Sequence, residues 1–99
     1  MPMSVMANGA RGEAVVSLAG EERRVCLTLG ALAEMETTLA CAGVGALAER
    51  LRAPSAGDLT VVLGALLRGG GEAEAEAVAS AAGFAEAAEA VARGLAAAV

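Results

Sequence analysis

The most constraining feature of the sequence is a change of hydrophobic period inside the stretch RVCLTLGALAEMETTL, which runs from Arg24 to Leu39. Its first residues alternate between apolar and polar, as is typical of a strand with one buried face. Within two residues of Thr28, the apolar residues begin to recur at helical spacing. Thr28 suits the N-cap of that helix, because its hydroxyl can accept from the free amides of the first turn. A strand that runs directly into a helix predicts a mixed fold.

Two runs of strand type, Glu13–Leu18 and Glu22–Leu27, flank Gly20 and predict a β-hairpin. Gly20 readily adopts the positive φ that a tight hairpin turn requires. A two-residue loop that begins at this glycine places Val16 opposite Val25. One face of the hairpin is then apolar, and other elements must cover it.

Three helices are predicted next, and each is bounded by residues that start or stop a helix. The first begins near Leu29, and Gly43 suits a left-handed stop. The second, Val44–Arg52, ends before Pro54 because proline cannot continue a helix. The third, Ala56–Arg68, has a capping-box pattern at its start, formed by Ser55 and Asp58. The expected buried stripes are Leu29, Leu32, Met35 and Leu39 in the first helix; Val44, Leu47, Ala48 and Leu51 in the second; and Leu59, Val62, Leu63, Leu66 and Leu67 in the third.

The run Gly69–Gly71 is predicted to be a hinge, because it has no side chain to pack and maximal backbone freedom. Beyond it, the Ala- and Glu-rich sequence predicts two helices that are separated near Gly83. Glu89 and Arg93 are spaced for an ion pair along the last helix. The fold class is therefore α+β, an N-terminal β-hairpin followed by a small bundle of four or five helices. A flexible N-terminus (1–12), a core (13–68) and a hinge with a helical C-terminal segment (69–99) form a single domain.

The composition excludes most chemistries. The chain has seven arginines against twelve acidic residues, a net charge of −5, no histidine, and Phe84 as its one aromatic residue. Without histidine it lacks the commonest general base and metal ligand, and its acidic charge has the wrong sign for binding nucleic acid. Cys26 and Cys41 fit neither a redox motif nor a zinc site, and we expect them to be separate thiols. We expect no enzyme activity, catalytic residue, cofactor, metal, nucleic-acid partner or membrane span. The start of the chain lacks the pattern of a secretory signal, so we expect a cytoplasmic protein.

Three motifs have a functional alternative that is weaker than the structural one. The glutamates Glu72, Glu74 and Glu76 point in different directions on a helix, so a solvated helix start is favoured over a metal site. The segment GALLRGGG lacks the Lys and the Ser or Thr of a phosphate-binding loop. A thiol enzyme that uses Cys26 or Cys41 has no histidine to activate the sulfur.

The segment RGEAVVSLAGEERRVCLTLGALAEMETTL, Arg11 to Leu39, together with ALAERL from Ala46 and VLGALLRGGG from Val62, supports a comparison with a known family. In this order, these elements resemble a small protein that gene transfer agent clusters encode next to the tail tube protein, in the phage tail assembly chaperone group. The resemblance covers about residues 8 to 71. One departure is Ala19, where relatives tend to carry Asp before the glycine of the turn.

The resemblance implies a non-enzymatic chaperone that binds an unassembled tail protein during tail morphogenesis. The implied client is the tape measure protein; the tail tube protein and a second copy of the chain are further candidates. The alternative is a minor structural component of the tail, such as a tube or connector subunit. From the third helix and the last helix, the expected partner-binding residues are Leu63, Leu67, Phe84, Val91 and Leu95.

Overall fold

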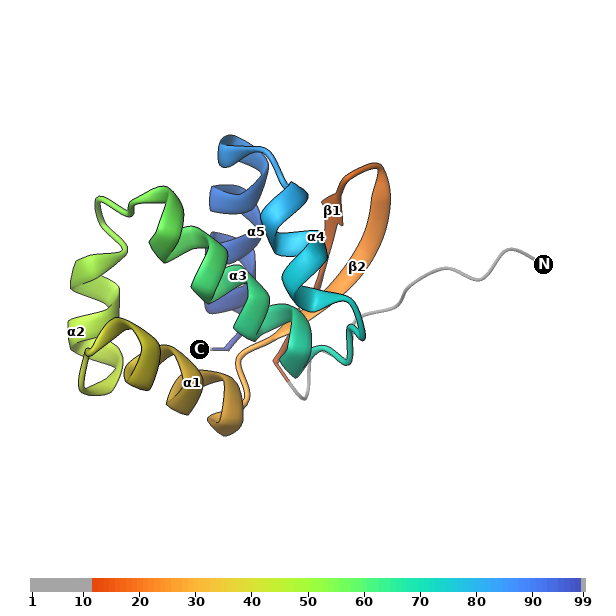
Figure 1. Ribbon diagram of the computed structural model, residues 1–99. Coiled ribbons are helices and arrows are strands. Elements are labelled where there is room, and N and C mark those ends of the chain that lie inside the picture. Colours follow the sequence, from red (N-terminus) through yellow and green to blue (C-terminus); the bar gives the residue numbers. More distant parts are fainter. Residues whose placement is uncertain (1–11, 99) are drawn as a thin grey trace.

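The computed structural model describes residues 12 to 98, so the predicted flexible N-terminus lies outside the described residues except for Gly12. The described elements are β1 (Glu13–Leu18), β2 (Glu21–Cys26), α1 (Leu29–Leu39), α2 (Gly43–Arg50), α3 (Ala56–Gly69), α4 (Ala75–Ala81) and α5 (Phe84–Ala97). A two-stranded antiparallel hairpin followed by five helices confirms the predicted α+β class. Figure 1 shows α3 through the middle of the molecule, with α1 and α2 to one side and α4, α5 and the hairpin to the other.

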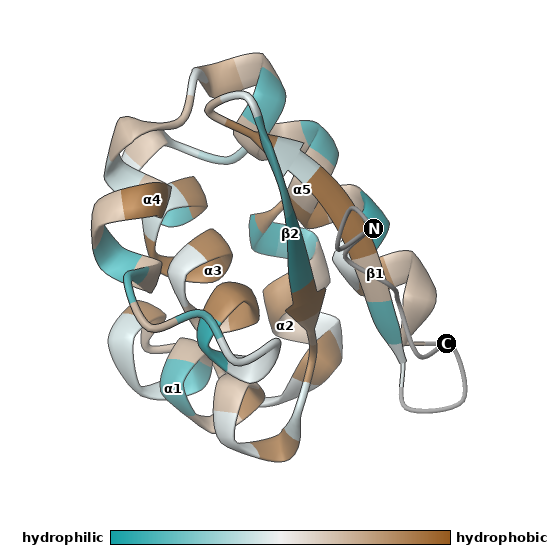
Figure 2. Ribbon diagram, turned by 90° about the vertical axis from the view of Figure 1, so that its right-hand side faces the viewer, coloured by the Kyte–Doolittle hydropathy of each residue, from teal (hydrophilic) through white to brown (hydrophobic). Residues whose placement is uncertain are grey.

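The hairpin has the predicted faces but a different register. Its loop is Ala19 and Gly20, whose φ angles of 54° and 80° are both positive, as in the tight turns that match strand twist. Val16 therefore lies opposite Arg23, and the predicted pairing of Val16 with Val25 is wrong by two residues. A shift of two preserves the alternation of faces. Val16 and Val25 are accordingly both buried, as expected. Figure 2 shows the hairpin lying across the helices, with β2 hydrophilic along most of its length.

The start of α1 agrees with the sequence, whereas its end does not. The amide of Ala31 donates to the Thr28 hydroxyl at 3.0 Å, which confirms the predicted N-cap. The helix ends at Leu39, and its C-cap is Ala40 in the left-handed conformation, not Gly43. The predicted buried stripe is also wrong at its first residue, because Leu29 is 86% exposed. The buried residues of this helix are Ala31, Met35 and Leu39.

The short helix α2 is attached mainly through polar contacts. Only Leu47 of this helix is buried, and Val44, predicted to face the core, is 58% exposed. The Glu36 carboxylate accepts the amide of Gly43 at 2.6 Å and so caps the start of α2 from α1. Near the other end, Arg50 donates to the Leu39 carbonyl at 2.8 Å. The helix is therefore held to the end of α1 at both of its own ends.

The long helix α3 is the centre of the core. Its predicted capping box is present, since the Asp58 amide donates to the Ser55 hydroxyl and the Ser55 amide donates to the Asp58 carboxylate. The helix packs against α1, α4, α5 and β2. All five residues of its predicted stripe are buried: Leu59, Val62, Leu63, Leu66 and Leu67.

The glycines at the end of α3 lie against β2. A Cβ atom added to Gly69 would overlap the Cys26 carbonyl, and one added to Gly70 would overlap the Arg24 carbonyl. Both glycines have negative φ angles, so close backbone approach and not backbone conformation requires glycine here. Gly71 does have a positive φ, of 91°. The sequence predicts a hinge here because these glycines have no side chains. In the structure, the same lack of side chains lets the end of α3 pack on β2. Hinge motion remains a prediction.

Candidate interaction surface

The described residues contain one hollow with an almost wholly apolar lining, between α2, the start of α3 and α5. We call it the α2–α5 groove, and its volume is ≈ 380 Å³. It exists because α2 packs on α1 and leaves the adjoining flank of α5 uncovered. The lining residues are Ala48, Leu51, Pro54, Leu59, Ala88, Val91, Ala92 and Leu95.

The groove has a buried floor and partly exposed walls. Leu59 and Val91 form the floor, and both also belong to the hydrophobic core. Leu51 and Leu95 are half-buried on the two walls, and Ala92 is exposed. Apolar walls that remain accessible to water favour the burial of a matching apolar side chain or helix face. The arrangement therefore suits protein binding and offers no group for covalent chemistry.

Phe84 lies at the N-terminal end of α5, close to this groove. Its side chain is 58% exposed although it is the largest apolar side chain of the protein. It lines a smaller neighbouring hollow that shares Leu59 with the groove. An exposed aromatic ring beside an apolar groove forms a continuous apolar surface along α5, the kind of surface that marks interaction sites.

The structure separates the five predicted partner-binding residues into two groups. Val91 is buried at the floor of the α2–α5 groove, where only a group that enters the groove can reach it. Leu63 and Leu67 are fully buried in the core, so their side chains are not available to a partner in this structure. The reason is that α3 is covered on several sides by α1, α4, α5 and β2. Phe84 and Leu95 are accessible at opposite ends of α5. The five predicted residues therefore do not form one surface. Partner binding itself remains a prediction.

The residues that sequence reasoning missed come from α2 and from the connection to α3. The sequence pattern places Leu51 in a core stripe and makes Pro54 a helix stop. In the structure both line the groove. Periodicity gives the apolar face of each helix, but it does not give the distance between two helices, and that distance creates this groove.

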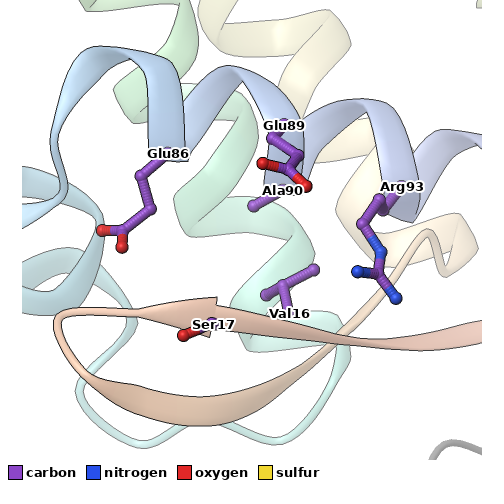
Figure 3. Close-up of a pocket in the computed structure, with 6 residues that line it drawn as sticks. All are labelled: Val16, Ser17, Glu86, Glu89, Ala90 and Arg93. Carbon is purple, nitrogen blue, oxygen red and sulfur yellow. The ribbon is translucent and has the colours of Figure 1, made fainter.

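A further hollow lies between α5 and β1 (Figure 3), and three of its six lining residues are charged. Its volume is ≈ 80 Å³. At one end, the carboxylate of Glu86 accepts the amide of Ala19 at 3.2 Å and so links α5 to the hairpin turn. Glu89 and Arg93 also project from α5 toward β1. The ion pair predicted between these two residues is not among those formed by the described residues.

Three ion pairs join separate segments of the fold. Arg23 of β2 donates to Glu72 at 2.8 Å, which lowers the pKa of that carboxyl. Arg50 forms the second pair, with Asp58. The pKa of Asp58 is lowered mainly by the hydrogen bond from the Ser55 amide and, to a smaller extent, by Arg50. Through these contacts, Arg23 and Arg50 hold neighbouring segments of the fold in position.

The described residues Arg68 and Glu34 form the third pair, between α3 and α1. The hydrogen bonds to Glu34 raise the pKa of Arg68. Glu76 lines the same shallow hollow as this pair. Because the arginine neutralises the nearby carboxylate, this hollow does not provide a concentrated negative site.

Residues 12 to 98 show no metal site and no disulfide. Within residues 12 to 98, no group of three or more His, Cys, Asp or Glu side chains could hold a metal ion. Cys26 is buried, Cys41 is half-buried, and no disulfide joins these two described residues. Among the described helices, no single one is long and apolar enough to cross a membrane; α1 and α2 reach that length and composition only together, and they are bent by 62°.

The family described as "Phage tail tube protein, GTA-gp10" matches residues 11–99, a span that includes every described element from β1 to α5. No curated protein and no solved structure matches the chain.

Proposed function

The chain belongs to the phage tail tube protein family GTA-gp10, and from this premise we propose that it is a structural component of a phage-like tail, such as a tube or connector subunit. The observation that carries the proposal is the extent of the match, which spans residues 11–99 and so includes both the hairpin and all five helices. Function is assigned from a site and not from a fold. The site relevant here is the apolar surface formed by the α2–α5 groove and Phe84.

The properties of that surface support a role carried out through protein contacts. Its lining is apolar, it is accessible, and it includes the one aromatic side chain of the protein. Aromatic residues are enriched at protein interfaces, where they contribute much of the binding energy. In this proposal the protein is not an enzyme, needs no cofactor and does not contact nucleic acid directly. We further propose that it acts in the cytoplasm.

A second candidate function is a tail assembly chaperone, and the small size of the sheet favours it. The described residues contain only two strands, which form one short hairpin. A tube wall built from sheet would need more strands than this chain contributes. In this alternative the α2–α5 groove would hold an apolar helix face of an unassembled tail protein, for which the tape measure protein is the proposed client.

Quantitative mass spectrometry of purified particles distinguishes the two functions. A structural component should be present in intact particles in a fixed ratio to the major tail protein, and it should remain after a high-salt wash. A chaperone should be absent from particles and should co-purify with a tail protein from lysates in which assembly is blocked. Particles from a strain that lacks the gene provide the control for background signal. Absence from particles, combined with binding to an unassembled tail protein, would reject the structural role.

A further inference from the structure

Helix α5 carries a projecting side chain and a hollow on the same face. The projecting side chain is Phe84, which is 58% exposed at the N-terminal end of the helix. The hollow is the α2–α5 groove, whose wall on this helix runs from Ala88 through Ala92 to Leu95. Phe84 and Leu95 are eleven residues apart, which corresponds to about 16 Å along a helix. A face with these two features can complement a second copy of itself.

We propose that two copies of this chain associate through α5, with the two helices antiparallel about a two-fold axis between Ala88 and Ala92. In a two-fold interface, if one residue contacts another across the axis, the reverse contact also forms. This axis places Phe84 of each copy at the Leu95 end of the other copy's groove. The proposal does not depend on whether the protein is a structural component or a chaperone.

The side chains near the axis permit close approach of the two helices. Ala88 is half-buried and Ala92 is exposed, and each presents only a methyl group. Small side chains at a contact allow the shorter of the usual distances between helix axes. The helices can therefore approach until each phenyl ring enters the opposite groove, where Leu59 and Val91 form the floor.

The size of the contact predicts a reversible dimer. The helix has 14 residues and is about 21 Å long. One helix pair with two inserted rings buries less than the roughly 1,200 Å² of a standard interface. We therefore expect a dimer that dissociates on dilution in the micromolar range.

Sedimentation velocity of the full chain across roughly 1 µM to 1 mM tests the proposal. The parent protein should shift from monomer to dimer with increasing concentration. Phe84→Ala should raise the dissociation constant at least about tenfold, because the ring is lost from both halves of the interface. Ala92→Glu should abolish association, because it places two like charges near the axis. Circular dichroism melts should show both variants folded, since both side chains are accessible in the monomer.

Matched controls separate this interface from a general effect of substitution. Ala77→Glu makes the same change at an exposed position of α4, and Leu29→Ala removes an exposed apolar side chain from α1; neither should alter association. A parent chain that stays monomeric throughout overturns the proposal, even if a helical segment of another tail protein binds the groove. A dimer that Phe84→Ala and Ala92→Glu leave intact overturns it as well.

Discussion

Single polar residues fix the relative positions of three helices. Arg50 donates to the Leu39 carbonyl and to the Asp58 carboxylate, and so connects the end of α1, the end of α2 and the start of α3. The capping box between Ser55 and Asp58 could be predicted, because both partners lie within four residues of each other. The role of Arg50 could not, since its partners are eight and eleven residues away and only the folded chain brings them together.

The lowered pKa of Asp58 makes one part of the stability dependent on pH. The Ser55 amide and Arg50 favour the charged carboxylate in the folded state, so its folded pKa lies below the unfolded value of about 3.9. This contribution is present above the unfolded value and is lost as the pH falls through the folded value. Asp58→Asn should therefore lower the urea midpoint at pH 7, and the difference from the parent should shrink toward pH 2. Glu49→Gln, in an exposed pair with Arg52, is the control and should have little effect.

The first helix provides a test of burial at single positions. Met35 is fully buried, whereas Leu29, which the sequence pattern placed in the same stripe, is 86% exposed. Met35→Ala should destabilise the protein by about 2–5 kcal/mol, through lost transfer free energy and the cavity that remains. Leu29→Ala should stay within about 0.5 kcal/mol of the parent. Denaturant unfolding of the two variants measures this difference, and equal losses would mean that a different face of α1 is buried.

At the scale of elements, local signals predicted what each segment is, and tertiary contacts decided where it ends. The Thr28 and Ser55 caps were predicted because each acts within its own first turn. The hairpin register was not predicted correctly, because Gly20 can occupy either position of a two-residue turn. The structure places it second, which requires Ala19 to adopt the left-handed region at φ 54°. That strain, of order 1 kcal/mol or more, persists only where surrounding contacts determine the turn.

The end of α3 gives the sharpest prediction at this scale. Gly69→Ala and Gly70→Ala should each destabilise the protein by about 1–3 kcal/mol, because the added methyl group overlaps a carbonyl of β2. Gly45→Ala is the matched control, since Gly45 lies in α2 and nothing lies near its added Cβ. This change should stabilise the protein by about 0.5–1 kcal/mol through helix propensity. Thermal melts of the three variants are sufficient, and a neutral result at both Gly69 and Gly70 would favour a hinge there.

For the molecule as a whole, the sequence predicts which residues form the core better than it predicts the shape of the surface. The five apolar residues of the α3 stripe are all buried, as their spacing predicts. The α2–α5 groove was not predictable, because it arises from how α2 sits relative to α5 and not from the pattern of either helix. The same limit explains why buried and accessible residues were placed together in the predicted partner-binding set.

The unequal attachment of the helices predicts unequal opening. Helix α2 contributes one buried residue, Leu47, whereas α3 is buried along most of its length. Local opening requires less free energy where few apolar contacts are lost. In native-state hydrogen exchange, amides of α2 should exchange well before those of residues 59 to 67. Protection of α2 equal to that of α3 would show instead that α2 opens only with the whole fold.

The contact of Gly69 and Gly70 with β2 also affects how the sequence can change over time. A substitution at a half-exposed position is usually tolerated, because the new side chain can extend into solvent. Here the glycines are half-buried, yet any larger residue meets a backbone carbonyl that has no rotamer to change. In a library of random variants, these two positions should therefore accept fewer replacements than several fully buried leucines, which can exchange with other aliphatic residues. Mutational tolerance usually increases with exposure. Where Gly69 and Gly70 contact β2, we expect the more exposed positions to be the less tolerant ones.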